Sequence, residues 1–524
     1  MRAKSGRLRG VVLRSRLGPF SDKKMNLGVL LEGVDVTKLF ELTYGHFLVT
    51  GEIEVHGIQY DSRKIEREDC FVALRGGGTD GHKFVEAAVE KGAKVVVLEQ
   101  DATLPDPYFM HMHVVKVVVP DSRKALARMS ANFFGHPARK LTMIGVTGTN
   151  GKTTTSHLVK SILEAAGRRA GLIGTIEYKI GNEVIPATHT TPESLELNEI
   201  LSRMLDAGCD SVSMEVSSHA LHQSRVFGLE YDAAVFTNLT QDHLDYHGTM
   251  EDYFRAKQLL FDGLANDAAA VINCDDAWGT KLASTTRARS ITFGAGDAAD
   301  VRATDIRLSM DGTSFRIRHE NKERELSSPL VGRFNVYNIL AAYASGLALG
   351  IPHEKIEKGI SNLTNVRGRF ERIASPKGWS AIVDYAHTPD ALEKCLLTVH
   401  DILPKDRRGR IITVFGAGGN RDKTKRPLMG KIAGSLSDLA IVTSDNPRTE
   451  NPERIIDDIV AGIPRESTVI RESDRRKAIH AALRQAQPGD VVVVAGKGHE
   501  DYQVIGKEKI HFNDREIIEE FIRG

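Results

Sequence analysis

A glycine-rich segment, Thr147–Thr154, carries the clearest chemical signal in this chain. It follows an apolar run, Leu141–Val146, that predicts a strand, and a helical pattern continues to Ala166. Backbone N–H groups at such a helix start surround a phosphate, the lysine reaches the β- and γ-phosphates, and the next threonine binds Mg²⁺. The strict pattern has glycine where this chain has Val146, so we interpret the segment as a variant P-loop, with a chance glycine-rich turn as the alternative. The candidate ATP-binding residues are Gly148, Thr149, Asn150, Gly151, Lys152, Thr153 and Thr154.

Two polar segments follow later apolar runs. Glu215 stands near the end of the run 211–216, where a carboxylate could hold a metal ion, although a solvated loop residue is the equal alternative. The segment 237–248 then places two aspartates and two histidines within six residues, at Asp242, His243, Asp245 and His247. This pattern indicates metal or phosphate chemistry, or a set of satisfied polar contacts, and the spacing alone does not decide between them.

Strand and helix patterns alternate in three blocks, so the predicted fold class is α/β with three domains. We place a small N-terminal α/β domain at 25–138, a central P-loop domain with a mostly parallel sheet at 139–366, and a doubly wound, Rossmann-like C-terminal domain at 367–524. The expected strands are 70–74, 95–98, 114–119, 141–146, 211–216, 233–236, 269–272, 381–383, 411–415, 439–443, 468–470 and 490–495.

The charge balance of the 524 residues argues against a nucleic-acid-binding protein. Lys and Arg number 70 and Asp and Glu 69, and residues 1–24 hold eight of the basic residues but one acidic residue. The remaining 500 residues therefore carry 62 basic against 68 acidic side chains. We expect the basic tail to be disordered or not translated, with Met25 as an alternative start and a transit peptide as a further alternative.

The cysteines and the hydropathy exclude other classes of protein. Four cysteines lie far apart without a CxxC pair, which argues against a disulfide scaffold and a cysteine-rich zinc site. No apolar run approaches the ~18 residues that a membrane span needs. We therefore expect a cytoplasmic protein without a membrane span.

Six motifs occur in order along the chain. They are GTNGKTT at 148–154, EVSSH at 215–219, TNLTQDHLDYHG at 237–248, GRFNVYN at 332–338, GRFE at 368–371 and DYAHTPD at 384–390. Together they resemble the Mur ligase family, ATP-dependent ligases that add amino acids to the peptidoglycan precursor. The resemblance extends from about Asp61 to the end of the sequence.

The resemblance implies a reaction in which ATP phosphorylates a substrate carboxylate and an amine then attacks the acyl phosphate. Phosphorylation supplies a leaving group, and the transfer needs positioning and charge neutralisation. The implied catalytic and metal-binding residues, serving two Mg²⁺ ions, are Lys152, Thr153, Glu215, His243 and Lys257. In the family the lysine at position 257 is carbamylated by CO₂, which makes it a carboxylate-like metal ligand; a surface lysine on an amphipathic helix at 250–261 is the alternative.

Substrate contacts are implied in the same way. Asn335 or Asn338 would face adenine, Arg369 the phosphates and Asp384 the ribose. The first block and the central block resemble segments that hold the UDP-sugar-peptide, although His189 stands where many relatives have Asn. The implied UDP-substrate residues are Ser62, Gly77, Gly78, Thr79, Thr190, Thr191, Ser217, Gln223 and Arg225.

The C-terminal block points to the amino acid that is added. Its segment DNPR at 445–448 resembles the motif of family members that add meso-diaminopimelate, whose distal carboxylate a guanidinium can bind bidentately. A structural turn role for Arg448 is the alternative. The implied diaminopimelate-binding residues are Arg421, Asp445, Asn446, Pro447, Arg448, Gly496 and Glu500.

The function expected from this resemblance is ATP-dependent ligation of meso-2,6-diaminopimelate to the D-glutamate of UDP-N-acetylmuramoyl-L-alanyl-D-glutamate, with release of ADP and phosphate, by a monomer. The alternatives are the same ligase adding L-lysine, a folylpolyglutamate-type ligase, and a non-catalytic P-loop switch or scaffold.

Overall fold

The structure of the chain is a computed structural model that describes residues 23–40, 43–44, 47–48, 53–76, 78–320, 322–403 and 409–524. The chain forms two compact units. The first comprises the residues up to Pro137 together with 192–202 and 223–228, and the second comprises the remainder. The expectation for the basic tail falls outside the described residues except at Lys23 and Lys24, and Gly77 also lies outside them. The three expected domain ranges stay a prediction.

The first unit contains a five-stranded sheet in the order β2-β9-β8-β7-β6, in which β2 is antiparallel and the other strands are parallel. Its longest helix, α4, begins where the Asp121 side chain accepts hydrogen bonds from two backbone N–H groups, and it ends at Gly135 with φ of 74°. The bounds are β1 Met25–Asn26, α1 Leu27–Leu30, β2 Lys38–Phe40, β3 Thr43–Tyr44, β4 Phe47–Leu48, β5 Glu54–Val55, β6 Ile58–Gln59, β7 Cys70–Val72, α2 Val85–Glu90, β8 Val95–Leu98, α3 Asp106–Met112, β9 Val115–Val118 and α4 Ser122–Phe134.

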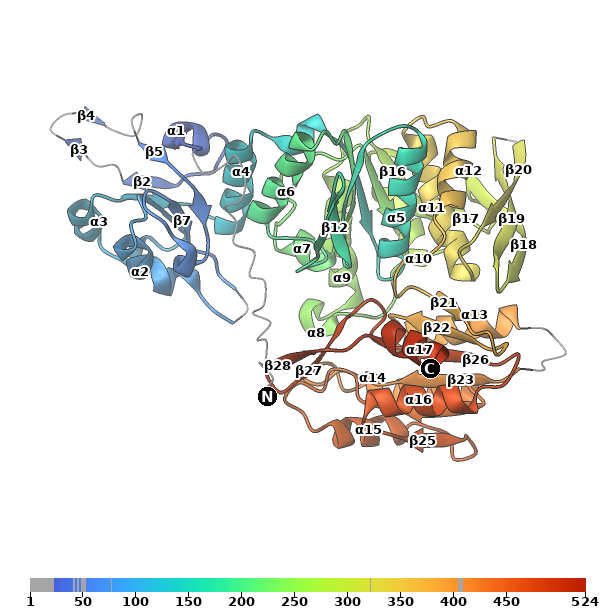
Figure 1. Ribbon diagram of the computed structural model, residues 1–524. Coiled ribbons are helices and arrows are strands. Elements are labelled where there is room, and N and C mark those ends of the chain that lie inside the picture. The colour runs from blue at the N-terminus through green and yellow to red at the C-terminus, as the bar shows by residue number, and fades with distance from the viewer. Residues whose placement is uncertain are drawn as a thin grey trace, which may run out of the picture. The chain divides into compact units, whose positions relative to one another are not determined.

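The second unit begins with an eleven-stranded sheet whose centre, β11-β14-β10-β15-β16-β17, is parallel. β18 continues the parallel order, antiparallel pairs form both edges of the sheet, and α5, α11 and α12 pack together beside it (Figure 1). The bounds are β10 Thr142–Thr147, α5 Lys152–Ala165, β11 Ala170–Ile173, β12 Glu177–Ile180, β13 Glu183–Pro186, β14 Ser211–Glu215, α7 Ser218–His222, β15 Ala233–Phe236, α8 Leu244–His247, α9 Met250–Asp262, β16 Ala269–Asn273, α10 Ala277–Thr285, β17 Arg289–Gly294, β18 Val301–Ser309, β19 Gly312–His319, β20 Lys322–Ser328, α11 Arg333–Ala348 and α12 His353–Asn362. The helix α6, Ser194–Asp206, belongs to the first unit up to residue 202 and to the second unit from residue 203.

A six-stranded sheet in the order β21-β22-β26-β23-β24-β25 completes the second unit. Successive residues of β26 alternate between two hydrophobic clusters, with Val491 and Val493 in one and Val492 and Val494 in the other, so helices cover both faces. The bounds are β21 Glu371–Ala374, β22 Ser380–Asp384, α13 Pro389–Ile402, β23 Ile411–Phe415, α14 Lys425–Leu436, β24 Leu439–Val442, α15 Pro452–Val460, β25 Val469–Arg471, α16 Arg475–Gln485, β26 Val491–Ala495, β27 Tyr502–Ile505, β28 Glu508–His511 and α17 Asp514–Arg523.

The observed elements confirm the expected α/β class. Each expected strand coincides with an observed one to within two residues at either end. Sequence reasoning missed the antiparallel hairpins β12–β13, β18–β20 and β27–β28. No helix in the described part of the chain is long and apolar enough to cross a membrane.

Candidate functional site

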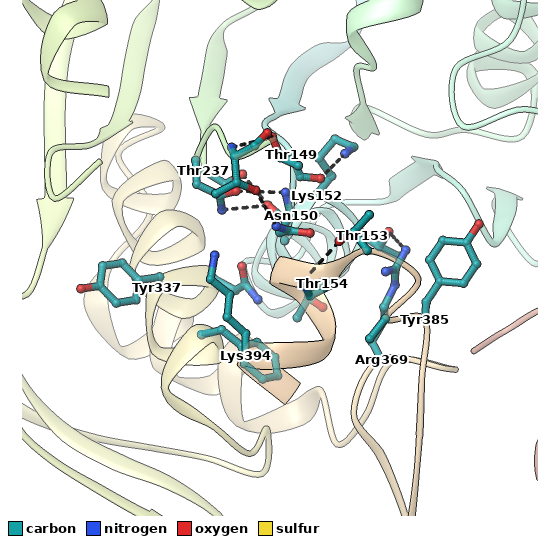
Figure 2. A pocket seen from close by; sticks show the side chains of 18 of the residues that line it. Thr149, Asn150, Lys152, Thr153, Thr154, Thr237, Tyr337, Arg369, Tyr385 and Lys394 are labelled. Carbon is teal, nitrogen blue, oxygen red and sulfur yellow. Dashed lines mark hydrogen bonds between the residues drawn. The ribbon is translucent and has the colours of Figure 1, made fainter. Parts of the chain in front are cut away.

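A cavity of about 620 Å³ opens at the carboxyl end of β10, where the P-loop segment leads into α5 (Figure 2). Gly148 and Gly151 have φ angles of 146° and 88°, which residues other than glycine rarely adopt. A Cβ atom on Gly148 would lie 1.9 Å from Thr237 Oγ1. The glycines therefore allow the loop to lie directly against the segment that follows β15. A chance glycine-rich turn, the alternative interpretation, does not explain why the loop borders a cavity.

The segment after β15 fixes the P-loop through polar contacts. Asn238 accepts hydrogen bonds from Thr149 N at its carbonyl, over 2.8 Å, and from Asn150 N at its side chain, over 3.0 Å. Thr237 Oγ1 in turn donates to the Asn150 carbonyl over 2.6 Å. These bonds explain part of the polar character of 237–248, because several of its side chains brace the loop.

Lys152 and Thr153, at the start of α5, line the cavity. The Lys152 ammonium donates to the carbonyls of Gly148 and Thr149, each over 2.9 Å, and burial lowers its pKa. Thr153 Oγ1 donates to Glu215 over 3.1 Å and accepts a bond from Arg369 over 3.1 Å. Figure 2 shows Arg369 directed at this hydroxyl.

Glu215 is fully buried at the end of β14, so the alternative of a solvated loop residue is wrong. Its carboxylate accepts hydrogen bonds from Thr153 Oγ1 and, over 2.8 and 3.0 Å, from the backbone and hydroxyl of Thr175. A carboxylate oxygen and a hydroxyl oxygen thus lie 3.1 Å apart at the cavity wall. Hard oxygen donors of this kind suit Mg²⁺.

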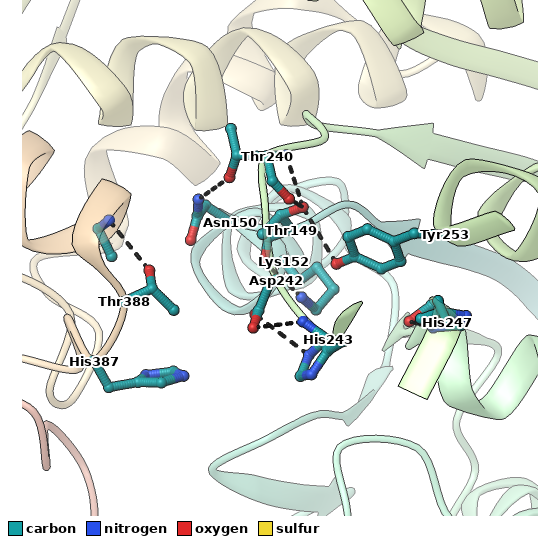
Figure 3. A network of polar contacts seen from close by, with 12 residues as sticks. Thr149, Asn150, Lys152, Thr240, Asp242, His243, His247, Tyr253, His387 and Thr388 are labelled. Atoms are coloured by element: carbon teal, nitrogen blue, oxygen red, sulfur yellow. Dashed lines mark hydrogen bonds and ion pairs between the residues drawn. The ribbon is translucent and has the colours of Figure 1, made fainter. Parts of the chain in front are cut away.

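His243 also lines the cavity, at the start of α8 with φ of 53° (Figure 3). Its Nε2 lies 3.3 Å from the Asp242 carboxylate, and burial lowers the pKa of the imidazole. Burial opposes ionisation of Asp242, but His243 and His387 hold the pKa of that carboxyl below its usual value. The described residues contain no group of three or more His, Cys, Asp or Glu side chains arranged to hold a metal ion.

Lys257 is buried on α9, with 1% of its surface exposed, so the alternative of a surface lysine is wrong. Its Nζ donates to the Gly148 carbonyl over 2.8 Å and lies 4.6 Å from the centre of the Tyr253 ring. Burial, assisted by the nearby charge of Lys152, lowers the pKa of this amine well below its usual value. The structure therefore brings Lys257 to the same loop as Lys152.

The expected nucleoside residues are divided between the cavity wall and the layer behind it. Asn338, Arg369 and Asp384 line the cavity, whereas Asn335 donates to the Val331 carbonyl and accepts a bond from Asn338. The Arg369 guanidinium stacks 4.7 Å from the centre of the Tyr385 ring. Burial raises the pKa of Asp384 to about 6.

Asp390, at the start of α13, makes polar contacts that sequence reasoning missed. Its Oδ2 accepts hydrogen bonds from Asn150 over 2.9 Å, Thr240 over 3.1 Å and Lys394 over 2.9 Å. The same oxygen therefore joins the P-loop to α13. The signal was present in the motif DYAHTPD, which ends in this aspartate.

The expected UDP-substrate residues are distributed over both units. In the second unit, Thr191 Oγ1 donates to the Glu215 carbonyl over 2.9 Å and accepts a bond from Ser217 N over 3.1 Å, and Thr190 Oγ1 lies 3.1 Å from Thr175 Oγ1. In the first unit, Arg225 donates to Gln223 over 2.7 Å. The remaining described members of the set, in the first unit, are Ser62, Gly78 and Thr79.

The expected diaminopimelate-binding residues, by contrast, come together at the carboxyl ends of β23, β24 and β26. Arg448, with φ of 51°, donates to the Gly419 carbonyl over 2.9 Å, and Arg421 is exposed nearby in the same loop as Gly419. Asn446 donates to Glu500 over 2.9 Å. The set also includes Asp445, which is buried, together with Pro447 and Gly496.

Comparisons with known proteins match nearly the whole chain. Family models described as Mur ligase family catalytic domain, Mur ligase middle domain and Mur ligase glutamate ligase domain match residues 54–134, 146–346 and 368–498. A UDP-N-acetylmuramoyl-L-alanyl-D-glutamate--2,6-diaminopimelate ligase from Clostridium botulinum is 44% identical over 502 residues, covering 95% of this chain and 100% of the relative.

Solved structures agree with this result. A structure of UDP-N-acetylmuramoyl-L-alanyl-D-glutamate--2,6-diaminopimelate ligase is 35% identical, covers 90% of this chain and 95% of its own, and superposes with a TM-score of 0.64. A MurF ligase from Thermotoga maritima in complex with ADP shares the fold, with 20% identity, coverage of 89% and 97%, and a TM-score of 0.61. The three-domain α/β fold is thus confirmed, and the chain belongs to the Mur ligase family.

Proposed function

We propose that this protein ligates meso-2,6-diaminopimelate to the D-glutamate of UDP-N-acetylmuramoyl-L-alanyl-D-glutamate, using ATP and releasing ADP and phosphate. The observation that carries the proposal is the 44% identity, over 95% of this chain, with a ligase named for that reaction. The cavity beside the P-loop supports it, because it gathers a lysine, an arginine, a carboxylate and hydroxyl groups where a nucleotide triphosphate would be held.

Lys152 and Arg369 would neutralise charge on the phosphates during transfer to the substrate carboxylate. The reaction forms a bond between the carboxylate oxygen and the γ-phosphorus and breaks the bond to ADP. The amine of the incoming amino acid then attacks the acyl carbon and expels phosphate. Phosphoryl transfer moves negative charge between the phosphate groups. The main contribution of the protein to this step is therefore the set of preorganised cations near the P-loop.

Thr153 and Glu215 fit the binding of Mg²⁺, because their oxygens lie 3.1 Å apart at the cavity wall. Glu215 and His243 would serve a second ion, as the resemblance implies, and a carbamate on Lys257 would be a further metal ligand. Mg²⁺ supplies charge neutralisation for the phosphates when bound. The burial of Glu215 and its three hydrogen bonds hold this carboxylate in place before any ligand arrives.

Lys257 is proposed to carry a carbamate. The neutral amine attacks CO₂, a bond forms between Nζ and carbon, and one proton leaves to solvent. Burial favours the neutral amine by lowering its pKa well below the usual value, which supports this modification. The product is an anion with two oxygens next to the P-loop, where the resemblance expects a metal ligand.

Arg448 and Arg421 are proposed to bind the carboxylates of diaminopimelate, with Gly496 and Glu500 facing its distal ammonium and backbone. L-lysine lacks the distal carboxylate, so its binding would leave the guanidinium of Arg448 without a partner. Such a loss of a polar partner on binding would disfavour L-lysine by ~10⁴-fold or more. A monomeric, cytoplasmic enzyme is the simplest form of the proposal.

Release of phosphate tests the proposal directly. The assay contains ATP, Mg²⁺ and the UDP-N-acetylmuramoyl-dipeptide, with meso-diaminopimelate or L-lysine added in parallel. We expect release that depends on diaminopimelate, and a product heavier by that residue in mass spectrometry. Release with lysine alone would keep the ligase and overturn the amino acid, whereas no release with either would favour a nucleotide-binding switch or scaffold.

A further inference from the structure

Lys497 lies beneath the loops that carry the proposed amino-acid-binding residues. It follows β26 between Gly496 and Gly498, whose φ values of 116° and 52° are in the left-handed region. This turn encloses the lysine, and none of its surface is exposed. Because lysine is almost never fully buried without partners, the groups around its ammonium determine what it does.

Four oxygens surround the ammonium, and they come from three segments. Nζ donates to the Tyr502 carbonyl over 2.7 Å and to Asn446 Oδ1 over 3.0 Å. The Asp445 carboxylate lies 3.1 Å away and the Glu500 carboxylate 3.5 Å away. The lysine therefore joins the loop after β24, the turn after β26 and the strand β27.

The contact with Asn446 fixes the orientation of its amide. Asn446 Oδ1 accepts bonds from Lys497 Nζ and, over 2.9 Å, from Val504 N, so this end of the amide must be the oxygen. The nitrogen end then donates to Glu500 over 2.9 Å. Lys497 thus sets Asn446, and through Asn446 it sets the carboxylate of Glu500.

The charge of Lys497 also acts on Asp445, the first residue of the DNPR segment. Burial opposes ionisation of this carboxyl, but the Lys497 ammonium and then Arg475 hold its pKa below the usual value. The loop that ends in Arg448 therefore begins at an ionised, buried carboxylate paired with Lys497.

We propose that Lys497 is a positioning residue for the amino acid substrate, acting through Asp445, Asn446 and Glu500. The inference rests on the proposed function, because it assigns a further residue to the same site. Lys497 itself does not meet the substrate, since its ammonium is enclosed by the four oxygens described above.

The test compares Lys497→Met with a matched control, Lys116→Met. Lys116 is also buried, with 1% of its surface exposed, and it is paired with Asp106, but it lies on β9 of the first unit. We expect Lys497→Met to raise the KM for diaminopimelate about ten- to hundredfold, because buried polar groups lose a partner, while the KM for ATP stays within about twofold. Lys116→Met should leave both KM values unchanged.

An unchanged KM for diaminopimelate in Lys497→Met, or an equal rise in both KM values, would overturn the proposal. If Lys497→Met does not fold, Lys497→Met combined with Asp445→Asn removes the unpaired carboxylate. This double variant should still show the raised KM, because Asn446 Oδ1 keeps only its bond from Val504 N and Glu500 loses the nearby ammonium, and a wild-type KM in it would refute the role. Wild-type enzyme without diaminopimelate-dependent phosphate release would instead refute the proposed function.

Discussion

Two buried lysines of the second unit, Lys257 and Lys497, have different surroundings and therefore different chemistry. Lys257 donates to a neutral carbonyl, lies near the cation of Lys152, and has a pKa well below the usual value. Lys497 faces the carboxylates of Asp445 and Glu500. Burial alone thus does not decide the role of a lysine. Lys257, whose nearest anion is the more distant Asp242, is the proposed nucleophile, whereas Lys497 lies within 3.5 Å of two carboxylates and is proposed as a positioning cation.

The largest effect should follow from removing Lys257. We expect Lys257→Ala to lower kcat about a thousandfold, because the proposed carbamate ligand of Mg²⁺, the ion that neutralises phosphate charge, is lost. Small carboxylates such as acetate should partly restore the rate. Turnover is measured by phosphate release, with Lys281→Ala, an exposed lysine, as the control. Full activity of Lys257→Ala would remove the functional difference between Lys257 and Lys497, since Lys257 would then have no role in turnover.

Thermal unfolding should separate the two lysines by the sign of the change. Lys497→Met leaves a buried carboxylate unpaired and should lower the free energy of unfolding by about 3 kcal/mol. Lys257→Met removes a costly buried amine and should raise it by about 1 kcal/mol in CO₂-depleted buffer.

The gain from Lys257→Met should also depend on pH in a defined direction. The folded state binds fewer protons than the unfolded state between the lowered pKa and the usual one, so stability rises with pH across that window. The gain from Lys257→Met should therefore be largest below the lowered pKa and vanish near pH 10. Melting curves measured from neutral pH up to about the usual lysine pKa check this. A loss of stability in both variants would break the comparison.

Arg448 tests the loop that Lys497 supports. Arg448→Ala should raise the KM for diaminopimelate about ten- to hundredfold, because a charge-assisted pair with a carboxylate is lost, and leave the KM for ATP unchanged. Arg454→Ala, on the exposed side of α15, is the matched control. Equal changes in both KM values would mean that Arg448 is a turn residue, as its positive φ also permits.

The smallest effect concerns Asp384, a half-buried carboxyl at the cavity wall, whose pKa desolvation raises to about 6. As an acceptor for the ribose hydroxyls it acts when ionised, so the KM for ATP should rise about two- to fivefold as the pH falls from 7 to 5.5. Asp384→Asn should lose this dependence. A pH profile that is the same in both proteins would contradict the assigned contact.

The sequence predicted the parallel strands well because these strands are short apolar runs with clear ends. It missed β18–β20 because polar and charged residues interrupt the apolar residues of these strands, as expected for a sheet edge exposed on one face. The family was predictable from six motifs. The sequence identified the side chains of those motifs, but it did not predict their positions or contacts in the fold.

Burial of charged residues could not be predicted from the residue types. Lys257 reads as a surface position on an amphipathic helix, yet its partner Gly148 is 109 residues away in the sequence. Glu215 and Lys497 are buried by similarly distant contacts, with Thr153 and Asn446. One signal for Lys497 was present, namely its place between two glycines directly after an apolar strand.

The three hydrogen bonds to Asp390 Oδ2 couple the P-loop segment to α13 beside the cavity. Asn150 and Lys394 both donate a hydrogen bond to the same oxygen of the Asp390 carboxylate. The loss of either donor therefore changes the position of this carboxylate and the strength of its bond to the other donor. Their substitution energies should therefore fail to add, as is usual for residues in one network. A ligand that draws Asn150 away would leave Thr240 and Lys394 as the donors to this oxygen, so that a change on the P-loop side would be felt on α13.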